Sequence, residues 1–561
     1  MNETAPLISG SNARGSIASH TADSKYCVVL TDDNLNNARW LLYVSHLFNQ
    51  FSEQSWQFCL AIFLSAFTNY ESLILVTSYG LVTYSFVFFF GSSIGRHIDG
   101  TNRLTIARQF ICLENICVLT ATYMCYILLS KEANINIDVN SEEHDDLDTV
   151  TESIYDRKSI LLLIGIHLLG AIALVLDTGF LVAVERDWIV VMSINASNIQ
   201  KSSGRELTQE EELEVQKSWL SDTNVKMRQI DLSCKIVAPA AAGFFIALFD
   251  DGTSKQHGYD LRGAALLVGG VNVAALIVEY ICTAKIYHEV PGLSPDPNIV
   301  ADDDMMAATR NLGKIKDVDL SEDNKTKNKN RRSLHFFDDL EVYFSQSICW
   351  AGFSLSLLYL NVALTFGNIM TGYLIWRGIS MEMIGLWRGV ASAAGLGGTF
   401  VYHCMVKKMS LVDVGMVSVV FQLLCLTACY VSLFVDNINI FFTLLISGVC
   451  FSRIGLWVFD ISITQLMQLH IPAPVRGVVG GVQQSLNAFF TVIIYTAGLF
   501  ISNPKYFYIY ASISFAGVVL AAFFYGLMVF SRKRIFQSND NIESAPIEQL
   551  KSDSERTPDS R

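Results

Sequence analysis

The segment WLLYVSHLFNQFSEQSWQFCLAIFLSAF, residues 40–67, decides the fold class of this chain. It is too apolar for a surface helix, yet it contains the polar residues His46, Asn49, Gln50, Glu53 and Gln57. Their spacing places them on one face of a helix that turns about 100° per residue. A carboxylate in a lipid-spanning helix is costly and normally faces a bundle interior or a water-filled path. We therefore expect Glu53 and its neighbours to line an ion pathway; the alternative is a kinked or interfacial helix whose polar side packs against neighbouring helices.

The composition of the whole chain is that of a membrane protein. Of its 561 residues, 51% are hydrophobic and 17% are charged, and the mean hydropathy is +0.36. Apolar runs of about 20 residues are long enough to cross a bilayer as helices. The formal net charge of −13 argues against nucleic acid as a partner. The twelve cysteines show no CxxC spacing, so we expect no disulfide framework.

Twelve apolar segments are predicted to cross the membrane as helices, six on each side of a polar insert. They cover approximately residues 40–67, 72–95, 104–130, 159–184, 229–250, 261–288, 342–373, 381–404, 411–435, 438–469, 474–502 and 505–530. Basic residues gather in the loops on one side, whereas the loop from Glu132 to Asp156 on the other side holds nine acids and no Lys or Arg. The positive-inside rule therefore predicts that both termini are cytoplasmic.

These segments divide the chain into five parts. We expect a cytoplasmic tail (1–38), an N-terminal lobe (39–290), a cytoplasmic central loop (291–340), a C-terminal lobe (341–531) and a second cytoplasmic tail (532–561). Gly91, Gly95, Asp99 and Arg103, between the second and third spans, resemble the signature of major-facilitator transporters. The expected fold is an all-α major-facilitator-type bundle of 12 transmembrane helices in two six-helix lobes around a central site.

Further polar residues in the N-terminal lobe could complete a cation site with Glu53. Glu114 lies beside Asn115 in the third span, and Asn272 and Glu279 are spaced i, i+7 on one face of the sixth. Carboxylate and amide oxygens suit a hard or borderline dication such as Ca²⁺, Mn²⁺ or Fe²⁺. Neighbouring acids repel one another, which favours exchange of protons for the cation. The alternative is that one or two of these acids pair with a base such as Lys235 or Lys285.

Three longer motifs carry a family resemblance. They are Arg186-Asp-Trp-Ile-Val-Val, Asn224-Val-Lys-Met-Arg228-Gln-Ile-Asp231 and Arg453-Ile-Gly-Leu-Trp-Val-Phe-Asp460. Together they resemble the ferroportin family of iron exporters (solute carrier family 40), in register from about residue 39 to 531. The resemblance implies a major-facilitator fold that exports ferrous iron from the cytosol by alternating access, coupled to protons or another cation. We do not expect an enzyme, because an integral-membrane enzyme would need a nucleophile–base set or a His-rich metal motif, and the ten histidines are scattered along the chain.

The resemblance further implies roles for particular residues. It places one cation site in the N-terminal lobe, at Glu53, Gln57, Glu114, Asn272 and Glu279. This site would bind Fe²⁺ as the transported ion and could also bind Ca²⁺ as a regulatory ion. No resident cofactor is expected. The cytoplasmic gate residues implied by the resemblance are Arg228 and Asp231. For the other two motifs we expect Arg453 and Asp460 to form a buried ion pair that sets helix packing and gating, and the tract Arg186–Val191, with Asp187, to latch the gate.

The chain also departs from the family pattern. The C-terminal lobe of the family offers a cysteine and a histidine where this chain has Asn368 and Ile494, so the soft ligands suited to ferrous iron are missing there. That cysteine anchors the hormone hepcidin in vertebrate members, so we do not expect hepcidin as a partner. Asn361, Thr365 and Asn368 are predicted to form a neutral polar helical face on the seventh span, and a second such face on the eleventh holds Gln483, Gln484, Asn487 and Thr491. Because amides bring no charge to offset dehydration of a dication, we expect one dominant cation site in the N-terminal lobe, with Asn368 and the other C-terminal groups as a low-affinity stepping point or a structural polar seam. Arg96 follows Gly95 where the family tends to have an acid. Asp177 has no family counterpart; it is either an additional proton or cation group or an acid near a water-filled vestibule.

The remaining expectations concern partners and location. Glu3, Leu7 and Ile8 match an acidic dileucine signal that cytosolic sorting adaptors read. We expect a multi-pass protein in contact with membrane lipid, in the plasma membrane or, alternatively, in an endosomal or lysosomal membrane. A carrier of Mn, Co or Zn, or a transporter-derived receptor or scaffold without metal flux, is the alternative function.

Overall fold

The computed structural model describes residues 31–67, 74–141, 156–202, 207–249, 261–294, 335–500 and 504–543. Nearly all of these residues are helical, and this part of the chain contains no β-strand, which confirms the predicted all-α class. The dileucine motif at Glu3, Leu7 and Ile8 and most of the central loop lie outside the described residues.

Six long helices and one short helix build the N-terminal lobe. They are α1 (Asp32–Ala66), α2 (Ile74–Gly100), α3 (Arg103–Ser141), α5 (Arg157–Ala183), α6 (Ile189–Ser202), α7 (Gln209–Phe249) and α8 (Arg262–Glu289). α1 begins where Oγ1 of Thr31 accepts a hydrogen bond from the backbone N of Asn34 at 3.3 Å, which satisfies one of the free amides at the helix start. It then packs against α7 and α8, so its polar face is directed into the lobe.

α5 starts at an aspartate on the predicted outer side. The Asp156 carboxylate accepts a hydrogen bond from the backbone N of Ser159 at 2.8 Å and pairs with Nζ of Lys131 at 2.9 Å. These contacts, the backbone one first, lower the pKa of Asp156 to about 2. At its other end α5 runs into a single π-helical turn, η1 (Val184–Trp188), before α6. Such turns are frequent at functional sites.

The C-terminal lobe contains a broken span. Its helices are α10 (His335–Ser345), α11 (Cys349–Leu357), η4 (Leu358–Leu360), α12 (Asn368–Trp376), α13 (Met381–Val406), α14 (Leu411–Ser432), α15 (Ile438–His470), α16 (Arg476–Phe500) and α17 (Phe507–Glu543), with short 3₁₀ turns η5 (Ala473–Val475) and η6 (Pro504–Tyr506) before the last two. Residues 361–367 are not helical, so the seventh predicted span is interrupted between η4 and α12. The prediction that residues 361 to 368 form one polar helical face is therefore wrong.

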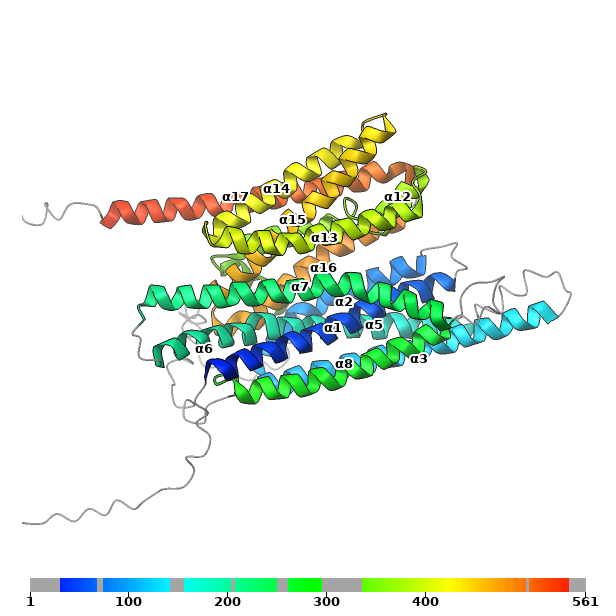
Figure 1. Cartoon of the computed structure of the whole chain (residues 1–561), viewed down its shortest axis with the longest axis horizontal. Coiled ribbons are helices and arrows are strands. Elements are labelled where there is room, and N and C mark those ends of the chain that lie inside the picture. The colour runs from blue at the N-terminus through cyan, green and yellow to red at the C-terminus, as the bar shows by residue number, and fades with distance from the viewer. Residues whose placement is uncertain are drawn as a thin grey trace, which may run out of the picture.

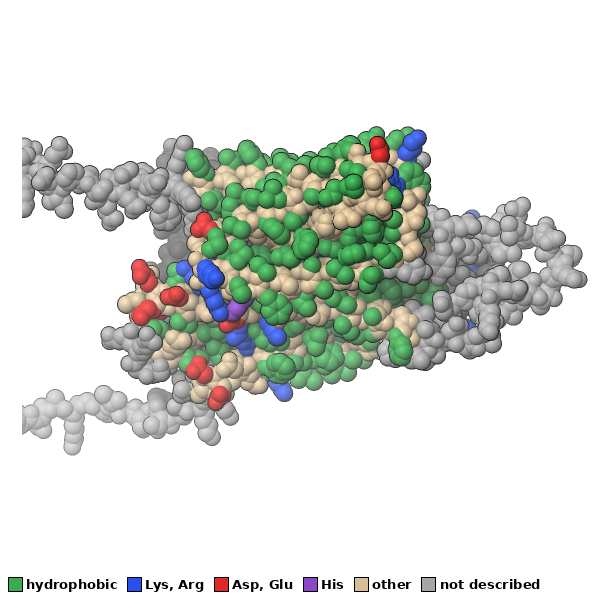
Figure 2. Space-filling model, turned by 45° about the horizontal axis from the view of Figure 1, so that its top comes forward, with side chains coloured by type: hydrophobic (Ala, Val, Ile, Leu, Met, Phe, Trp, Pro, Cys, Tyr) green, Lys and Arg blue, Asp and Glu red, His purple; other side chains and the backbone are tan. Residues whose placement is uncertain are grey.

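The two lobes lie side by side with their helices running in roughly the same direction (Figure 1). α1 begins and α17 ends at the same end of the bundle, the predicted cytoplasmic end, which is on the left in Figure 1. Eight of the described helices are long and apolar enough to cross a membrane by length and composition. The other four predicted spans are the polar-striped α1 and α7, the glycine-rich α13 and the broken α11–α12. Figure 2 shows hydrophobic side chains over the flank of the bundle, as lipid contact requires.

α2 and α16 join the lobes along a seam of glycines. A Cβ on Gly95 would lie 2.2 Å from the backbone oxygen of Gly477, and one on Gly481 would lie 2.3 Å from that of Gly91. Small residues at this spacing let two helix backbones touch. At the predicted cytoplasmic end, the carboxylate of Asp99 accepts hydrogen bonds of 2.8 Å from the backbone N of Gly477 and of Val478. A side chain of α2 thus caps the start of α16.

Candidate functional site

The polar stripe of α1 faces the interior of the N-terminal lobe, as predicted. His46, Asn49 and Gln50 are buried, Glu53 is half-buried, and Gln57 is exposed. Nε2 of Gln57 donates a hydrogen bond to the carboxylate of Glu53 one turn earlier. The stripe therefore passes from a closed region near His46 to an accessible one near Gln57.

Three of the predicted ligands, on α3 and α8, are buried, and each has a side-chain oxygen without a hydrogen bond to any described residue. Glu114 is 5% exposed, Glu279 is 1% exposed and Asn272 is 3% exposed. Oε2 of Glu114, Oε2 of Glu279 and Oδ1 of Asn272 have no hydrogen-bond partner in the described part of the chain. Nδ2 of Asn272 lies 3.4 Å from Oγ of Ser52 on α1. Buried oxygens without a partner are costly, so their retention indicates a function other than packing.

Asp177 on α5 lies close to the same acids. It is buried, and its Oδ1 accepts a hydrogen bond from Nδ2 of Asn49 at 3.2 Å. Asn49 lies one helical turn before Glu53, so Asp177 faces the same part of the α1 stripe. We call the four carboxylates of Glu53, Glu114, Asp177 and Glu279 the N-lobe acid cluster. No described Lys, Arg or His forms an ion pair with any of the four, so the alternative pairing of an acid with Lys235 or Lys285 is not found.

The acid cluster is spread out in this conformation. Among the residues that the structure describes, no three Asp, Glu, His or Cys side chains lie close enough together to hold a metal ion. Mutual repulsion favours such spacing. The donor set of carboxylate and amide oxygens fits a dication chemically, but the side chains would have to move toward one another to surround it.

Asp231 on α7 connects the α1 stripe to a contact between the lobes. Its Oδ1 pairs with Nε2 of His46, and its Oδ2 accepts a hydrogen bond from Nη1 of Arg228 at 2.6 Å. Nη2 of Arg228 lies 2.9 Å from Oδ2 of Asp460 on α15, in the other lobe. The predicted gate residues Arg228 and Asp231 therefore belong to one chain of contacts that crosses the interface.

The expected ion pair between Arg453 and Asp460 is wrong. Asp460 faces Arg228, whereas Nη2 of Arg453 donates to the backbone oxygen of Leu364, in the broken seventh span, at 3.4 Å. Residues i and i+7 are about 10.5 Å apart along a helix axis. Closer partners from other helices therefore replace the predicted one.

Asp187, in the π-helical turn, makes a second link between the lobes. It pairs with Arg103 of α3, and its Oδ1 lies 3.5 Å from Nη1 of Arg476 at the start of α16. The neighbouring Arg186 donates to the backbone oxygen of Thr464 on α15 at 3.3 Å. This is the position expected of a latch, although its part in gating stays a prediction.

Sequence reasoning missed a group of amides that also tie the lobes together. Nε2 of Gln468 donates to the backbone oxygen of Glu185 at 2.7 Å, and its Oε1 accepts from Nδ2 of Asn224 at 2.6 Å. Nε2 of Gln465 donates to the backbone oxygen of Lys217 at 2.7 Å. The signal available in the sequence was the pair Gln465 and Gln468, spaced i, i+3 near the C-terminal end of α15, which places both amides on one side of the helix.

Arg96, which departs from the family pattern, has a nearby carboxylate. Its Nη1 lies 2.9 Å from Oδ1 of Asp339 on α10, a side chain that is 4% exposed. The pair links α2 of one lobe to the helix that enters the other. The departure at Arg96 is thus matched by an acid from a different part of the chain.

The polar side chains of the C-terminal lobe bind one another. Nε2 of Gln483 donates to Oγ of Ser356 at 2.7 Å, and its Oε1 accepts from the Tyr343 hydroxyl at 2.6 Å. Oδ1 of Asn487 accepts from the same Ser356 at 2.7 Å. Asn368 begins α12, but its side chain lies outside what the structure describes. Gln483 and Asn487 of α16 therefore serve the contact with α10 and α11.

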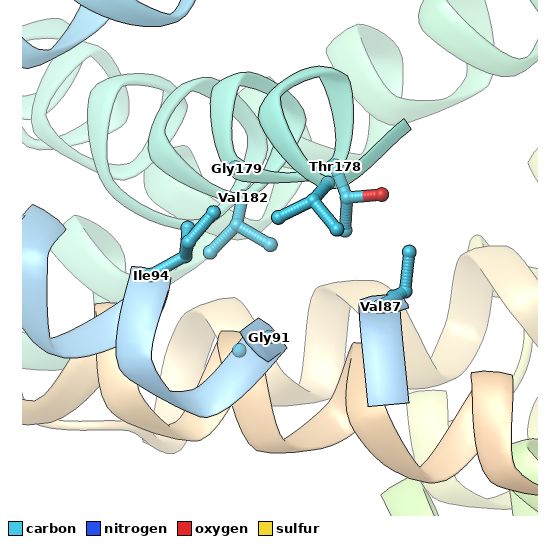
Figure 3. Close-up of a pocket in the computed structure, with 8 residues that line it drawn as sticks. Val87, Gly91, Ile94, Thr178, Gly179 and Val182 are labelled. Carbon is cyan, nitrogen blue, oxygen red and sulfur yellow. The ribbon is translucent and has the colours of Figure 1, made fainter. Parts of the chain in front are cut away.

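An apolar pocket between α2, α5 and α16 is separate from the acid cluster. It is lined by Val87, Gly91, Ile94, Val175, Thr178, Gly179, Val182 and Gly481. In Figure 3, Thr178, Gly179 and Val182 of α5 lie across from Val87, Gly91 and Ile94 of α2. None of these residues is titratable, so we assign the pocket to helix packing.

Comparison with known proteins finds the same family by a family model and by individual relatives. The family described as Ferroportin1 (FPN1) matches residues 36–203 and 214–518. The chain is 28% identical over 527 residues to "Solute carrier family 40 member 2" of Arabidopsis thaliana, covering 90% of this chain and 92% of that protein. It is 25% identical over 568 residues to ferroportin of Homo sapiens, covering 88% of this chain and 91% of that protein.

Solved structures share the fold. A bacterial homologue of the iron transporter ferroportin, in an outward-facing state with soaked iron, superposes with a TM-score of 0.65 at 20% identity, covering 88% of this chain and 99% of that one. The proton:xylose symporter XylE of the major facilitator superfamily gives a TM-score of 0.54 at 11% identity, covering 88% of this chain and 95% of that one. The predicted major-facilitator fold is confirmed.

Proposed function

This chain belongs to the ferroportin family, and from that membership we propose that it exports ferrous iron from the cytosol by alternating access. As a family member with the major-facilitator fold, it is a multi-pass membrane transporter and not an enzyme. The observation that carries the proposal is the set of buried oxygens on Glu114, Asn272 and Glu279 that have no hydrogen-bond partner among the described residues, together with the half-buried Glu53. We place the protein in the plasma membrane, with an endosomal or lysosomal membrane as the alternative.

The contacts between the lobes support a gating cycle. Asp99, Arg228 and Asp187 each bind a group of the other lobe. All three contacts would have to break for a cation to enter the acid cluster from the cytosol. Their re-formation would close that route, while Glu53 and Gln57 remain the accessible end of the α1 stripe. Each of these contacts involves a charged group, so the closed arrangement is held by polar bonds that can re-form repeatedly.

The chemistry of the acid cluster supports exchange of the dication with protons. Four neighbouring carboxylates cannot all stay charged at low cost inside a membrane protein unless a cation offsets them. A dication and protons would therefore compete for the same oxygens. The same donor set suits Mn²⁺ and Ca²⁺, so transport of another dication, or a regulatory Ca²⁺ at this site, is the alternative.

The test is metal flux measured with Fe²⁺, Mn²⁺, Co²⁺ and Zn²⁺ side by side, in cells and in reconstituted vesicles. We expect Fe²⁺ efflux in the parent and loss of most of it in Glu53→Ala. Gln54→Ala, next in sequence but off the polar stripe, is the matched control. Parental iron efflux from Glu53→Ala at equal surface abundance would contradict the pathway assignment. Absence of flux for all four metals would favour the receptor or scaffold alternative.

A further inference from the structure

Asp177 is a buried carboxylate of α5, in a stretch that packs on α2 through apolar and small residues. It is 5% exposed, and no described basic side chain lies within ion-pair distance of it. The neighbouring residues Val175, Thr178 and Gly179 face α2 at the apolar pocket. Asp177 instead reaches α1, through its hydrogen bond with Asn49. A buried carboxylate that has a neutral hydrogen-bond donor but no ion-pair partner is costly at such a position, and packing gives no reason for it.

Asn49 brings Asp177 into the neighbourhood of the cation ligands. It lies on the polar stripe of α1, one helical turn before Glu53. Its Oδ1 accepts a hydrogen bond from Nε2 of Gln50, the next residue of the same stripe, at 3.1 Å. The unpartnered Oε2 atoms of Glu114 and Glu279 provide independent evidence that the region is built to receive a ligand. α5 thereby adds a fourth helix to the three that carry the predicted ligands.

We propose that Asp177 is a fourth acid of the cation site, one that strengthens dication binding by its charge while Asn49 holds it in place. The inference rests on the proposed function, because it concerns the cation that this site would carry. A carboxylate near the ligands attracts a dication without touching it, and the attraction is strong where water is scarce. Asp177 thus offsets part of the cost of removing the hydration shell, which the neutral Asn272 and Gln57 cannot do.

A purely structural role makes a different demand on this position. To hold Asn49, residue 177 needs only an oxygen that accepts a hydrogen bond. The amide oxygen of asparagine can accept that bond, and asparagine has nearly the volume of aspartate. Asp177→Asn therefore removes the charge and keeps the contact. Asp177→Glu keeps the charge and displaces the carboxylate by one methylene.

The experiment is calorimetric titration of Co²⁺ into the purified full-length protein in lipid nanodiscs. We expect Asp177→Asn to weaken the apparent affinity by about tenfold or more, the ratio that corresponds to about 1.4 kcal/mol, and Asp177→Glu to recover most of it. Asp413→Asn, which removes a half-buried acid in the first turn of α14 in the other lobe, should bind as the parent does. If Asp177→Asn does not fold, Asp177→Ser replaces it with the same expectation.

The outcomes separate the two proposals. Parental affinity in Asp177→Asn, or the same loss in Asp177→Glu as in Asp177→Asn, would overturn the inference and leave the proposed function standing. Lack of saturable Co²⁺ binding in the parent itself would overturn the cation site and, with it, this inference.

Discussion

Replacement of Gly95 by alanine should open the seam between α2 and α16. The new Cβ would stand 2.2 Å from the carbonyl oxygen of Gly477 and 2.7 Å from its carbonyl carbon. Both are backbone atoms, so the two helices must separate by about 1 Å, and overpacking of this kind costs about 1–3 kcal/mol. The clash exists only while the seam is closed. A bias of that size shifts a two-state equilibrium about 5- to 150-fold toward the open arrangement.

Ser485 of α16 can report this opening. It is fully buried, and its Oγ donates to the backbone oxygen of Val87 on α2. In a background without other reactive cysteines, Ser485→Cys should react slowly with an impermeant maleimide applied to the cytosolic face, and Gly95→Ala should raise that rate about fivefold or more. Gly397→Ala is the matched control, because no atom lies within 4 Å of a Cβ there. Equal rates in all three proteins would refute the assignment of this seam as the cytoplasmic closure.

Three further predictions concern topology, binding and stability. Epitope tags at residue 20, within 310–330 and at residue 550 should be reached by antibody only after permeabilisation, and a tag near Asp145 on intact cells; outside labelling at 320 would contradict the six-plus-six arrangement. Neutralising Glu53 together with Glu114 should abolish saturable metal binding in calorimetry, whereas Asn368→Ala should change it little; two equal-affinity sites in the parent would contradict a dominant N-lobe site. Because the pKa of Asp156 is lowered to about 2, its stabilising contacts are complete above about pH 4 and fade as the pH falls toward 2. The thermal stability of Asp156→Ala should therefore be lower than that of the parent at pH 7, and the difference should shrink over that range.

The sequence predicted those features that depend on local periodicity. A polar stripe at helical spacing in an apolar run placed His46, Asn49 and Gln50 on the buried face of α1, and their burial agrees with that prediction. Each predicted span corresponds to a helix or, for the seventh, to a broken pair of helices. These predictions succeed because a chain in lipid must form all of its backbone hydrogen bonds within each spanning segment. A sufficiently long apolar segment therefore indicates a helix.

Partners contributed by other helices could not be predicted in this way. Asp460 was assigned to Arg453 on its own helix, yet it binds Arg228 from the other lobe. Which side chains meet across an interface depends on helix rotation and on how closely the backbones approach, and neither is encoded in the spacing within one segment. The same limit left the two alternative roles of Asp177 undecided, because its contact with α1 appears only when the helices are packed.

The contrast between the lobes supports a single dominant cation site. Gln483 and Asn487 in the C-terminal lobe bind Ser356 and other described groups, so their polar atoms are used within the fold. Glu114 and Glu279 in the N-terminal lobe are equally buried but keep oxygens without a described partner. A fold retains such oxygens at a cost in stability, and a ligand that satisfies them recovers that cost on binding. The C-terminal amides offer no comparable gain, because a cation would first have to break the bonds that they already form.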